Sequence, residues 1–112
     1  MRALMGPALL QRGKELTMHT RHLGIALVSL AALAGWIVST LGPTTPWHVS
    51  RFHPAHQMRG VDPTPVATLL RAAAIGRAAG LHHVYVGNAP ELHLEHTRCV
   101  GCGSVVIERS AY

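Results

Sequence analysis

Residues 63–88 read PTPVATLLRAAAIGRAAGLHHVYVGN, and this stretch decides the fold because a helix-forming pattern passes directly into a strand-forming one. Thr64 is a favourable helix N-cap, Pro65 a favourable first helical residue, and Gly80 a favourable residue just after the last turn. Apolar residues recur on one side at helical spacing: Val66, Leu69, Leu70 and Ala73. The stretch therefore predicts a helix that ends near Gly80, followed by a short strand in residues 82–88.

A second short strand is predicted upstream, within residues 44–54, TTPWHVSRFHP. Residues 47–52 combine β-forming with polar side chains and lie between two prolines. Alternate residues of a strand point to opposite faces, so each face of this strand carries polar groups. Strands of a covered parallel sheet are usually apolar on both faces. The pattern therefore favours a strand with one face lining a polar cavity.

The order of elements predicts an α/β fold. Residues 23–41, LGIALVSLAALAGWIVSTL, form an uncharged run before Gly42 and Pro43, which stop a helix well. Helix, strand, helix and strand in succession are typical of βα units with a parallel sheet. Two such units neither close a barrel nor complete a doubly wound sheet, so we expect residues 23–88 to need neighbouring strands.

The helical run also has the length of a membrane span. Nineteen uncharged residues reach the minimum for crossing a bilayer, and basic residues precede them. Its many alanines and glycines and its hydroxyl residues make it a mediocre span. A single-pass anchor and a helix buried in a globular protein are the two alternatives at this point.

Residues 1–22 show no clear period and are predicted to be a poorly structured leader. The net charge of +5 combines +3 from residues 1–22 with +2 from residues 51–112, where six arginines are scattered with few aromatic residues between them. A nucleic-acid-binding surface normally gathers its basic residues in a patch or stripe. We therefore expect no nucleic-acid partner.

Three residues at the ends of the predicted strands are candidate ligand-binding residues. Arg51 would place a cation at the carboxyl end of the first strand, which suits a carboxylate or phosphate, and a salt bridge is the alternative. His53 follows in the loop, and Asn88 follows the second strand. Loops after the carboxyl ends of strands are where α/β proteins place their sites.

Cys99 and Cys102 form a CxxC motif in the terminal segment, residues 89–112, which we expect to be a metal knuckle followed by a strand over 104–109. A zinc site needs four ligands, and His93 and His96 could complete a Cys2His2 set. A disulfide or redox pair and a turn with free thiols are the alternatives. The sequence has no P-loop, GxGxxG or GxSxG motif and no cysteine triad with iron–sulfur spacing.

Taken together, four segments resemble the C-terminal part of radical SAM enzymes of the AmmeMemoRadiSam system, which are similar to pyruvate formate-lyase-activating enzymes. The resemblance covers roughly residues 32–112, in matching order and spacing. It depends on the segments TPWHVSRFHP, PTPVATLLRAAAIGRAAGL, VYVGN and CVGCGSVVIERSAY. Ala67 departs from it, because the family usually has an acidic residue there.

The resemblance implies a partial (β/α) barrel that binds a [4Fe–4S] cluster and S-adenosyl-L-methionine. It implies reductive cleavage of S-adenosylmethionine to a 5′-deoxyadenosyl radical. Arg51, His53 and Asn88 would then face the barrel cavity, and Cys99 and Cys102 would match a C-terminal knuckle rather than the catalytic cluster site.

The family holds its cluster with a CxxxCxxC motif in the N-terminal part, and this motif is absent from the sequence. We therefore expect a C-terminal fragment of a cytoplasmic radical SAM enzyme, inactive alone, from a truncated or frameshifted reading frame, with a missing N-terminal barrel half as its partner. The alternatives are a small membrane-anchored protein with a CxxC metal or redox site, and a module that docks onto another chain. The substrate is not indicated.

Overall fold

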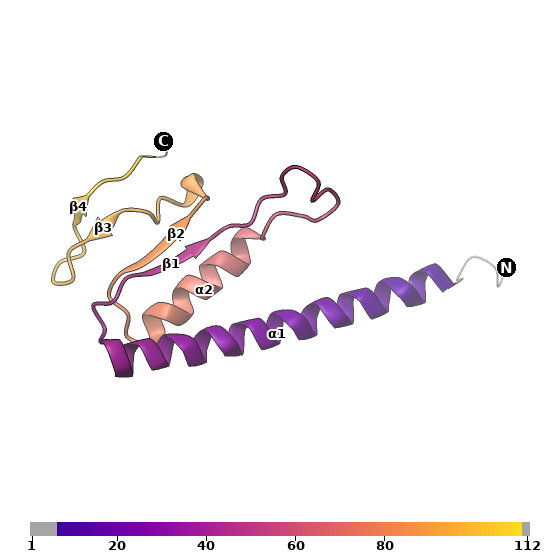
Figure 1. The fold of residues 1–112 in the computed structure, drawn as a ribbon, viewed down its shortest axis with the longest axis horizontal. Helices are drawn as coiled ribbons and strands as arrows, with labels where there is room; N and C mark the ends of the chain where they lie inside the picture. The colour runs from indigo at the N-terminus through magenta and orange to yellow at the C-terminus, as the bar shows by residue number, and fades with distance from the viewer. Residues whose placement is uncertain (1–6, 111–112) are drawn as a thin grey trace.

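The structure is a computed structural model that describes the backbone of residues 7–110 and the side chains of residues 24–110. A long helix is followed by one βαβ unit and a C-terminal hairpin (Figure 1). In chain order the elements are α1 (Pro7–Leu41), β1 (Trp47–Ser50), α2 (Val66–Ala78), β2 (Val84–Gly87), the short 3-10 helix η2 (Pro90–Leu92), β3 (Thr97–Arg98) and β4 (Val105–Ile107).

Helix α1 is longer at its N-terminal end than the sequence predicts. It begins at Pro7 and therefore takes in most of the stretch 1–22, which we expected to be a poorly structured leader; residues 1–6 lie outside the described part. Pro7 is favourable in the first turn, and no proline follows it before Leu41. The end of the helix is as predicted: Gly42 has a φ of 100°, and its N–H donates to the Ile37 carbonyl at 3.1 Å.

Helix α2 ends as predicted but begins differently. Gly80 has a φ of 107°, and the N–H groups of Gly80 and Leu81 donate to the Arg77 and Gly76 carbonyls, which is a Schellman motif. The N-cap position is occupied by Pro65, with no side-chain capping bond, so the prediction that Thr64 caps the helix was wrong. The Thr64 hydroxyl instead accepts the Phe52 N–H at 3.1 Å, because this loop folds back on the end of β1.

Strands β1 and β2 form a parallel pair, which confirms the predicted α/β class and the parallel sheet. The register pairs Trp47 with Val84 and Ser50 with Gly87. The described strands form two sheets of two strands each, and they do not form a closed barrel.

The two edges of the parallel pair differ. Beyond β2, the Val86 N–H donates to the Leu94 carbonyl, so the C-terminal segment covers that edge in part. The N–H groups of Trp47 and Arg51 donate toward β2, so by alternation His48 and Ser50 direct their backbone groups to the other edge. No described strand lies along that edge, which we call the free edge of β1.

Helix α2 lies between α1 and the parallel sheet (Figure 1). Leu69 and Ala73 of α2, Trp47 of β1, Val86 of β2 and Ala34 of α1 are buried in one cluster. Leu70 was expected on the buried stripe, but it is 43% exposed. The buried face of α2 runs through Leu69, Ala72, Ala73 and Gly76 instead.

Candidate functional site

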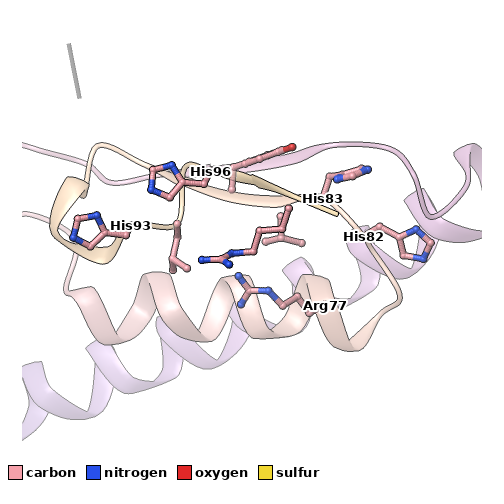
Figure 2. A pocket seen from close by; sticks show the side chains of 9 residues that line it. Arg77, His82, His83, His93 and His96 are labelled. Atoms are coloured by element: carbon pink, nitrogen blue, oxygen red, sulfur yellow. The ribbon is translucent and has the colours of Figure 1, made fainter. Parts of the chain in front are cut away.

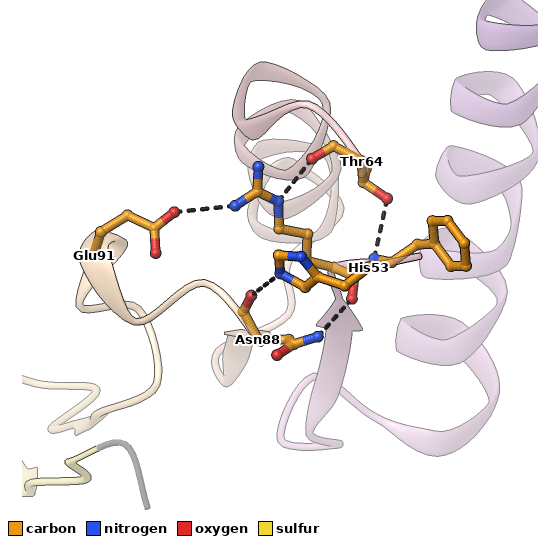
Figure 3. A network of polar contacts seen from close by, with 6 residues as sticks. His53, Thr64, Asn88 and Glu91 are labelled. Atoms are coloured by element: carbon orange, nitrogen blue, oxygen red, sulfur yellow. Dashed lines mark hydrogen bonds and ion pairs between the residues drawn. The ribbon is translucent and has the colours of Figure 1, made fainter. Parts of the chain in front are cut away.

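The three predicted ligand-binding residues do come together at the carboxyl ends of β1 and β2 (Figure 3). The Arg51 N–H donates to the Gly87 carbonyl at 3.0 Å, and the Asn88 side-chain amide donates to the Arg51 carbonyl at 3.0 Å. Asn88 has a φ of 60°, a left-handed conformation that asparagine tolerates better than most residues. His53 Nε2 lies 3.2 Å from the Asn88 carbonyl, to which it donates when that nitrogen is protonated.

The Arg51 side chain is used to hold loops together. Its Nε donates to the Thr64 carbonyl at 2.8 Å, and its Nη1 lies 3.2 Å from Glu91 Oε1 (Figure 3). Arg51 is 18% exposed and Glu91 is 52% exposed, so the first contact is better shielded from solvent than the ion pair. The guanidinium therefore joins the loop before α2 to η2. That Arg51, His53 and Asn88 bind a cofactor stays a prediction.

We expect Arg51→Lys to lower the free energy of unfolding by about 1–3 kcal/mol, because an ammonium cannot reach both Thr64 and Glu91 in the geometry of the guanidinium fork. Glu91→Gln is the comparison, and it should cost less than about 1 kcal/mol because the ion pair is half exposed. Urea unfolding followed by circular dichroism measures both. Equal losses in the two variants would show that the ion pair, rather than the bond to Thr64, holds the loops.

A cavity of about 520 Å³ lies on the face of the parallel sheet opposite α2, and we call it the sheet-face cavity. His48 and Ser50 of β1 line it together with Tyr85 and Gly87 of β2, which are their partners in register. This confirms the prediction that one face of the first strand lines a polar cavity. Its volume is in the range of small-molecule sites, about 300–1,000 Å³.

The remaining wall of the sheet-face cavity comes from Asn88 and the C-terminal segment. Arg109 lies over the Tyr85 ring at 5.3 Å, and its Nη1 donates to the Glu95 carbonyl and to Thr97 Oγ1, each at 2.8 Å. The Tyr85 hydroxyl lies 3.0 Å from Thr97 Oγ1, and the His48 ring stacks on Tyr85 at 4.7 Å. Sequence reasoning missed these lining residues as a group.

The sequence indicates only some of the residues that line the sheet-face cavity. The alternation that places His48 and Ser50 on one face of β1 also places Tyr85 and Gly87 on one face of β2. Glu95 and Arg109 reach the cavity only because the terminal segment folds back over the sheet, and no sequence motif indicates that.

Cys99 and Cys102 lie at the tip of the β3–β4 hairpin. The Cys99 N–H donates to the Ser104 carbonyl at 2.8 Å, and the Gly103 N–H donates to the Cys99 carbonyl at 2.9 Å. These bonds close a tight turn, as expected for a knuckle. Both cysteines are free thiols, so a disulfide is not formed.

The Cys2His2 alternative is not assembled by the described residues. No group of three or more His, Cys, Asp or Glu residues within residues 24–110 is placed to hold a metal ion. His93 and His96 instead stack on each other, with ring centroids 6.3 Å apart. Zinc binding by Cys99 and Cys102 stays a prediction.

The exposed Cys102 thiol has a pKa below the ordinary value for cysteine. Its Sγ lies 3.3 Å from Ser104 Oγ, and hydrogen bonding by the Ser104 side chain and then by its backbone lowers the pKa of Cys102, with a further contribution from Cys99. A lowered thiol pKa means more thiolate at neutral pH, and the thiolate is the reactive form.

We expect Ser104→Ala to raise the pKa of Cys102, because the substitution removes the largest cause of its lowering. The pH profile of Cys102 alkylation by iodoacetamide should then move to higher pH, with slower reaction at neutral pH. Tandem mass spectrometry separates Cys102 from Cys99 within one peptide. An unchanged profile would show that the Ser104 hydroxyl does not act on the thiol.

The comparisons with known proteins give one relative and no family. An uncharacterized protein of Methanocaldococcus jannaschii is 46% identical to this chain over 69 residues, which are 62% of the chain and 21% of that protein. The chain thus spans about a fifth of the length of this relative. No protein-family model matches, and no solved structure matches at a significant level.

Proposed function

We propose that the chain is the C-terminal part of a radical SAM-type enzyme and that it supplies the last two strands of a partial (β/α) barrel. The free edge of β1, next to a polar face that lines a cavity, is the observation that carries this proposal. The open edge of a two-stranded sheet presents unpaired N–H and C=O groups, which a further strand would pair. The longer archaeal relative agrees with a chain that is one part of a larger protein.

The two faces of the sheet have the polarity that a barrel wall requires. In (β/α) barrels the helices form the outer ring and the inward side chains line the interior. Here α2 covers the face that carries Trp47 and Val86, so the face that carries His48 and Tyr85 would point inward. The sheet-face cavity would then be part of the barrel interior, where the family binds S-adenosylmethionine and its substrate.

Helix α1 precedes β1 and packs on α2 rather than directly on the sheet. In the proposal, a strand before α1 pairs with β1 along its free edge. Large apolar side chains on α1 are exposed and would be covered by the missing part: Ile25, Val28, Leu33, Trp36 and Leu41. The missing N-terminal barrel half is therefore the proposed partner.

The residues of this chain do not fit a [4Fe–4S] cluster. Cys99 and Cys102 are its two cysteines, whereas the family motif supplies three thiolates. The hairpin tip also lies outside the sheet-face cavity lining. In the proposal this chain therefore shapes the cavity wall in a cytoplasmic enzyme, and the cluster and its redox chemistry belong to the missing half.

Complex formation tests the proposal. The archaeal relative, produced without the segment that matches this chain, should form a one-to-one complex with the chain in size-exclusion chromatography. Ser50→Pro should abolish the complex, because it removes a free-edge N–H while leaving the β1–β2 bonds intact. Ser110→Pro, in the exposed terminal segment, is the control. Failure of the unmodified chain to bind, or equal binding by Ser50→Pro, would contradict the proposal.

The DNA upstream of the coding sequence provides a second test. A reading frame there that encodes a CxxxCxxC-containing barrel half would support the proposal. Non-coding sequence with start signals for this chain would count against it.

A membrane-anchored protein is the second candidate function. The segment Gly24–Leu41 has a mean hydropathy of 2.0 and only 6% of it is buried, so by length and composition it could cross a membrane. Against this, Ala34 is fully buried, and Leu30 and Val38 pack on the same cluster, so a span would have to leave α2. Carbonate extraction followed by flotation decides: release into the soluble fraction excludes the anchor, and flotation with membranes favours it over the barrel fragment.

A further inference from the structure

A second, smaller pocket shares Tyr85 with the sheet-face cavity but has no lining residue from β1, and we call it the basic pocket (Figure 2). It has a volume of about 80 Å³ and lies between the C-terminal turn of α2, the start of β2 and the segment before the hairpin. Its lining includes two arginines and four histidines and no acidic residue: Arg77, Arg98, His82, His83, His93 and His96.

Arg77, Arg98, His82 and His93 are exposed, so water rather than protein groups meets most of their hydrogen bonds. The structure shows no hydrogen bond or ion pair from the side chains of Arg77, His82, His83 and His93 to other described residues. The ion pair within the described part of the chain joins Arg51 to Glu91, and neither residue lines the basic pocket. Arg98 uses one nitrogen to donate to the Gly103 carbonyl, which leaves further guanidinium donors available.

From this arrangement we propose that the basic pocket binds an oxyanion group, a phosphate or a carboxylate carried by a small molecule. Figure 2 shows Arg77, on α2, directed toward the space between the helix and the strand, with His83 and His96 along the strand and His93 at the far end of that space. Two guanidinium groups that line one pocket make the local potential positive, which favours an anion. A bound oxyanion would accept hydrogen bonds from their N–H groups.

The pocket size and the local fields agree with this ligand. A cavity of roughly 10–15 Å³ holds one water molecule, so about 80 Å³ admits a polyatomic anion but not a nucleotide. The C-terminal end of α2 opposes an anion weakly. Charge-assisted hydrogen bonds from the arginines are stronger than this effect and outweigh it.

A divalent metal fits the basic pocket less well. Histidine nitrogens are good ligands, but two permanent positive charges at the same pocket repel a cation. The described histidines are also not gathered into a group of three or more metal ligands. The proposal does not depend on the radical SAM assignment, because it uses only contacts within this chain.

Titration of the full chain with inorganic phosphate at constant ionic strength tests the proposal, with histidine ring signals in ¹H–¹⁵N NMR spectra as the readout. We expect saturable shifts of the pocket histidines. Arg77→Gln should weaken phosphate binding about tenfold or more, since each 1.4 kcal/mol is about tenfold. Arg71→Gln, an exposed residue of the same helix outside the pocket, should stay within about twofold of the unmodified chain.

A second pair of titrations compares methyl phosphate with acetate. Tighter binding of methyl phosphate than of acetate would assign the site to a phosphate-bearing ligand, and the reverse order to a carboxylate. Absence of saturable shifts, equal affinity in Arg77→Gln, or equal loss in Arg71→Gln would overturn the proposal. Saturable Zn²⁺ binding at these histidines without phosphate binding would overturn it too.

Discussion

Gly76→Ala is expected to lower the free energy of unfolding by about 1–3 kcal/mol, because the added methyl group overpacks the core. A Cβ at Gly76 would clash with two ring atoms of Trp47 and lie 3.3 Å from Val84 Cγ2. The Trp47 ring is 9% exposed and is held between α2 and the sheet, so it cannot move aside without disturbing the cluster. Urea unfolding followed by circular dichroism measures the loss.

Gly35→Ala is the matched control. Gly35 lies on α1, and a Cβ there would meet nothing within 4 Å. The substitution should be neutral or stabilise the chain by up to about 1 kcal/mol, because alanine favours the helix over glycine. A stabilising effect of Gly76→Ala similar to that of Gly35→Ala would mean that Trp47 does not pack against α2 as described.

The largest expected loss is that of Leu69→Ala, about 2–5 kcal/mol, because it leaves a cavity in the middle of the cluster. Leu69 is 2% exposed and joins α2 to both α1 and the sheet. Leu70→Ala is the neighbouring control, since Leu70 is 43% exposed and its loss should stay within about 0.5 kcal/mol. Thermal unfolding of both variants gives the comparison.

The two leucines also distinguish between two arrangements of α2. A larger loss for Leu70→Ala than for Leu69→Ala would mean that α2 is rotated from the orientation in the structure. That outcome would restore the apolar stripe that the sequence alone predicts, with Leu70 on the buried face.

The parts of the fold that the sequence predicts correctly depend on local chemistry. Gly80 ends α2 because a positive φ suits glycine, and Gly42 ends α1 for the same reason. The two short strands and the polar face of the first follow from alternation. These features need no knowledge of what the chain packs against.

The parts that the sequence does not predict depend on tertiary contacts. Thr64 has a favourable capping side chain, but its hydroxyl is taken by the Phe52 N–H across the loop. Leu69 and Leu70 are the same residue type, and the packing of α2 against α1 and the sheet decides which one is buried. The side chain of Arg51 contacts Thr64 and Glu91, which are far from it in the sequence, so the sequence alone does not predict these contacts.

The candidate site also combines residues that the sequence predicts with residues that only tertiary contacts bring together. The ends of the two strands place Arg51, His53 and Asn88 together, as the parallel arrangement predicts. The wall made by Arg109 depends on the terminal segment folding back over Tyr85. The basic pocket likewise combines residues from α2 with residues near the hairpin, so no single motif marks it.

Anaerobic reconstitution of the full chain with iron and sulfide tests the central claim most directly. The account predicts that the chain alone holds no stable [4Fe–4S] cluster, because Cys99 and Cys102 are its two thiols and lie on a hairpin tip outside the sheet-face cavity lining. Iron and sulfide should be lost on gel filtration. A full [4Fe–4S] complement per chain with the corresponding absorption band would contradict the account.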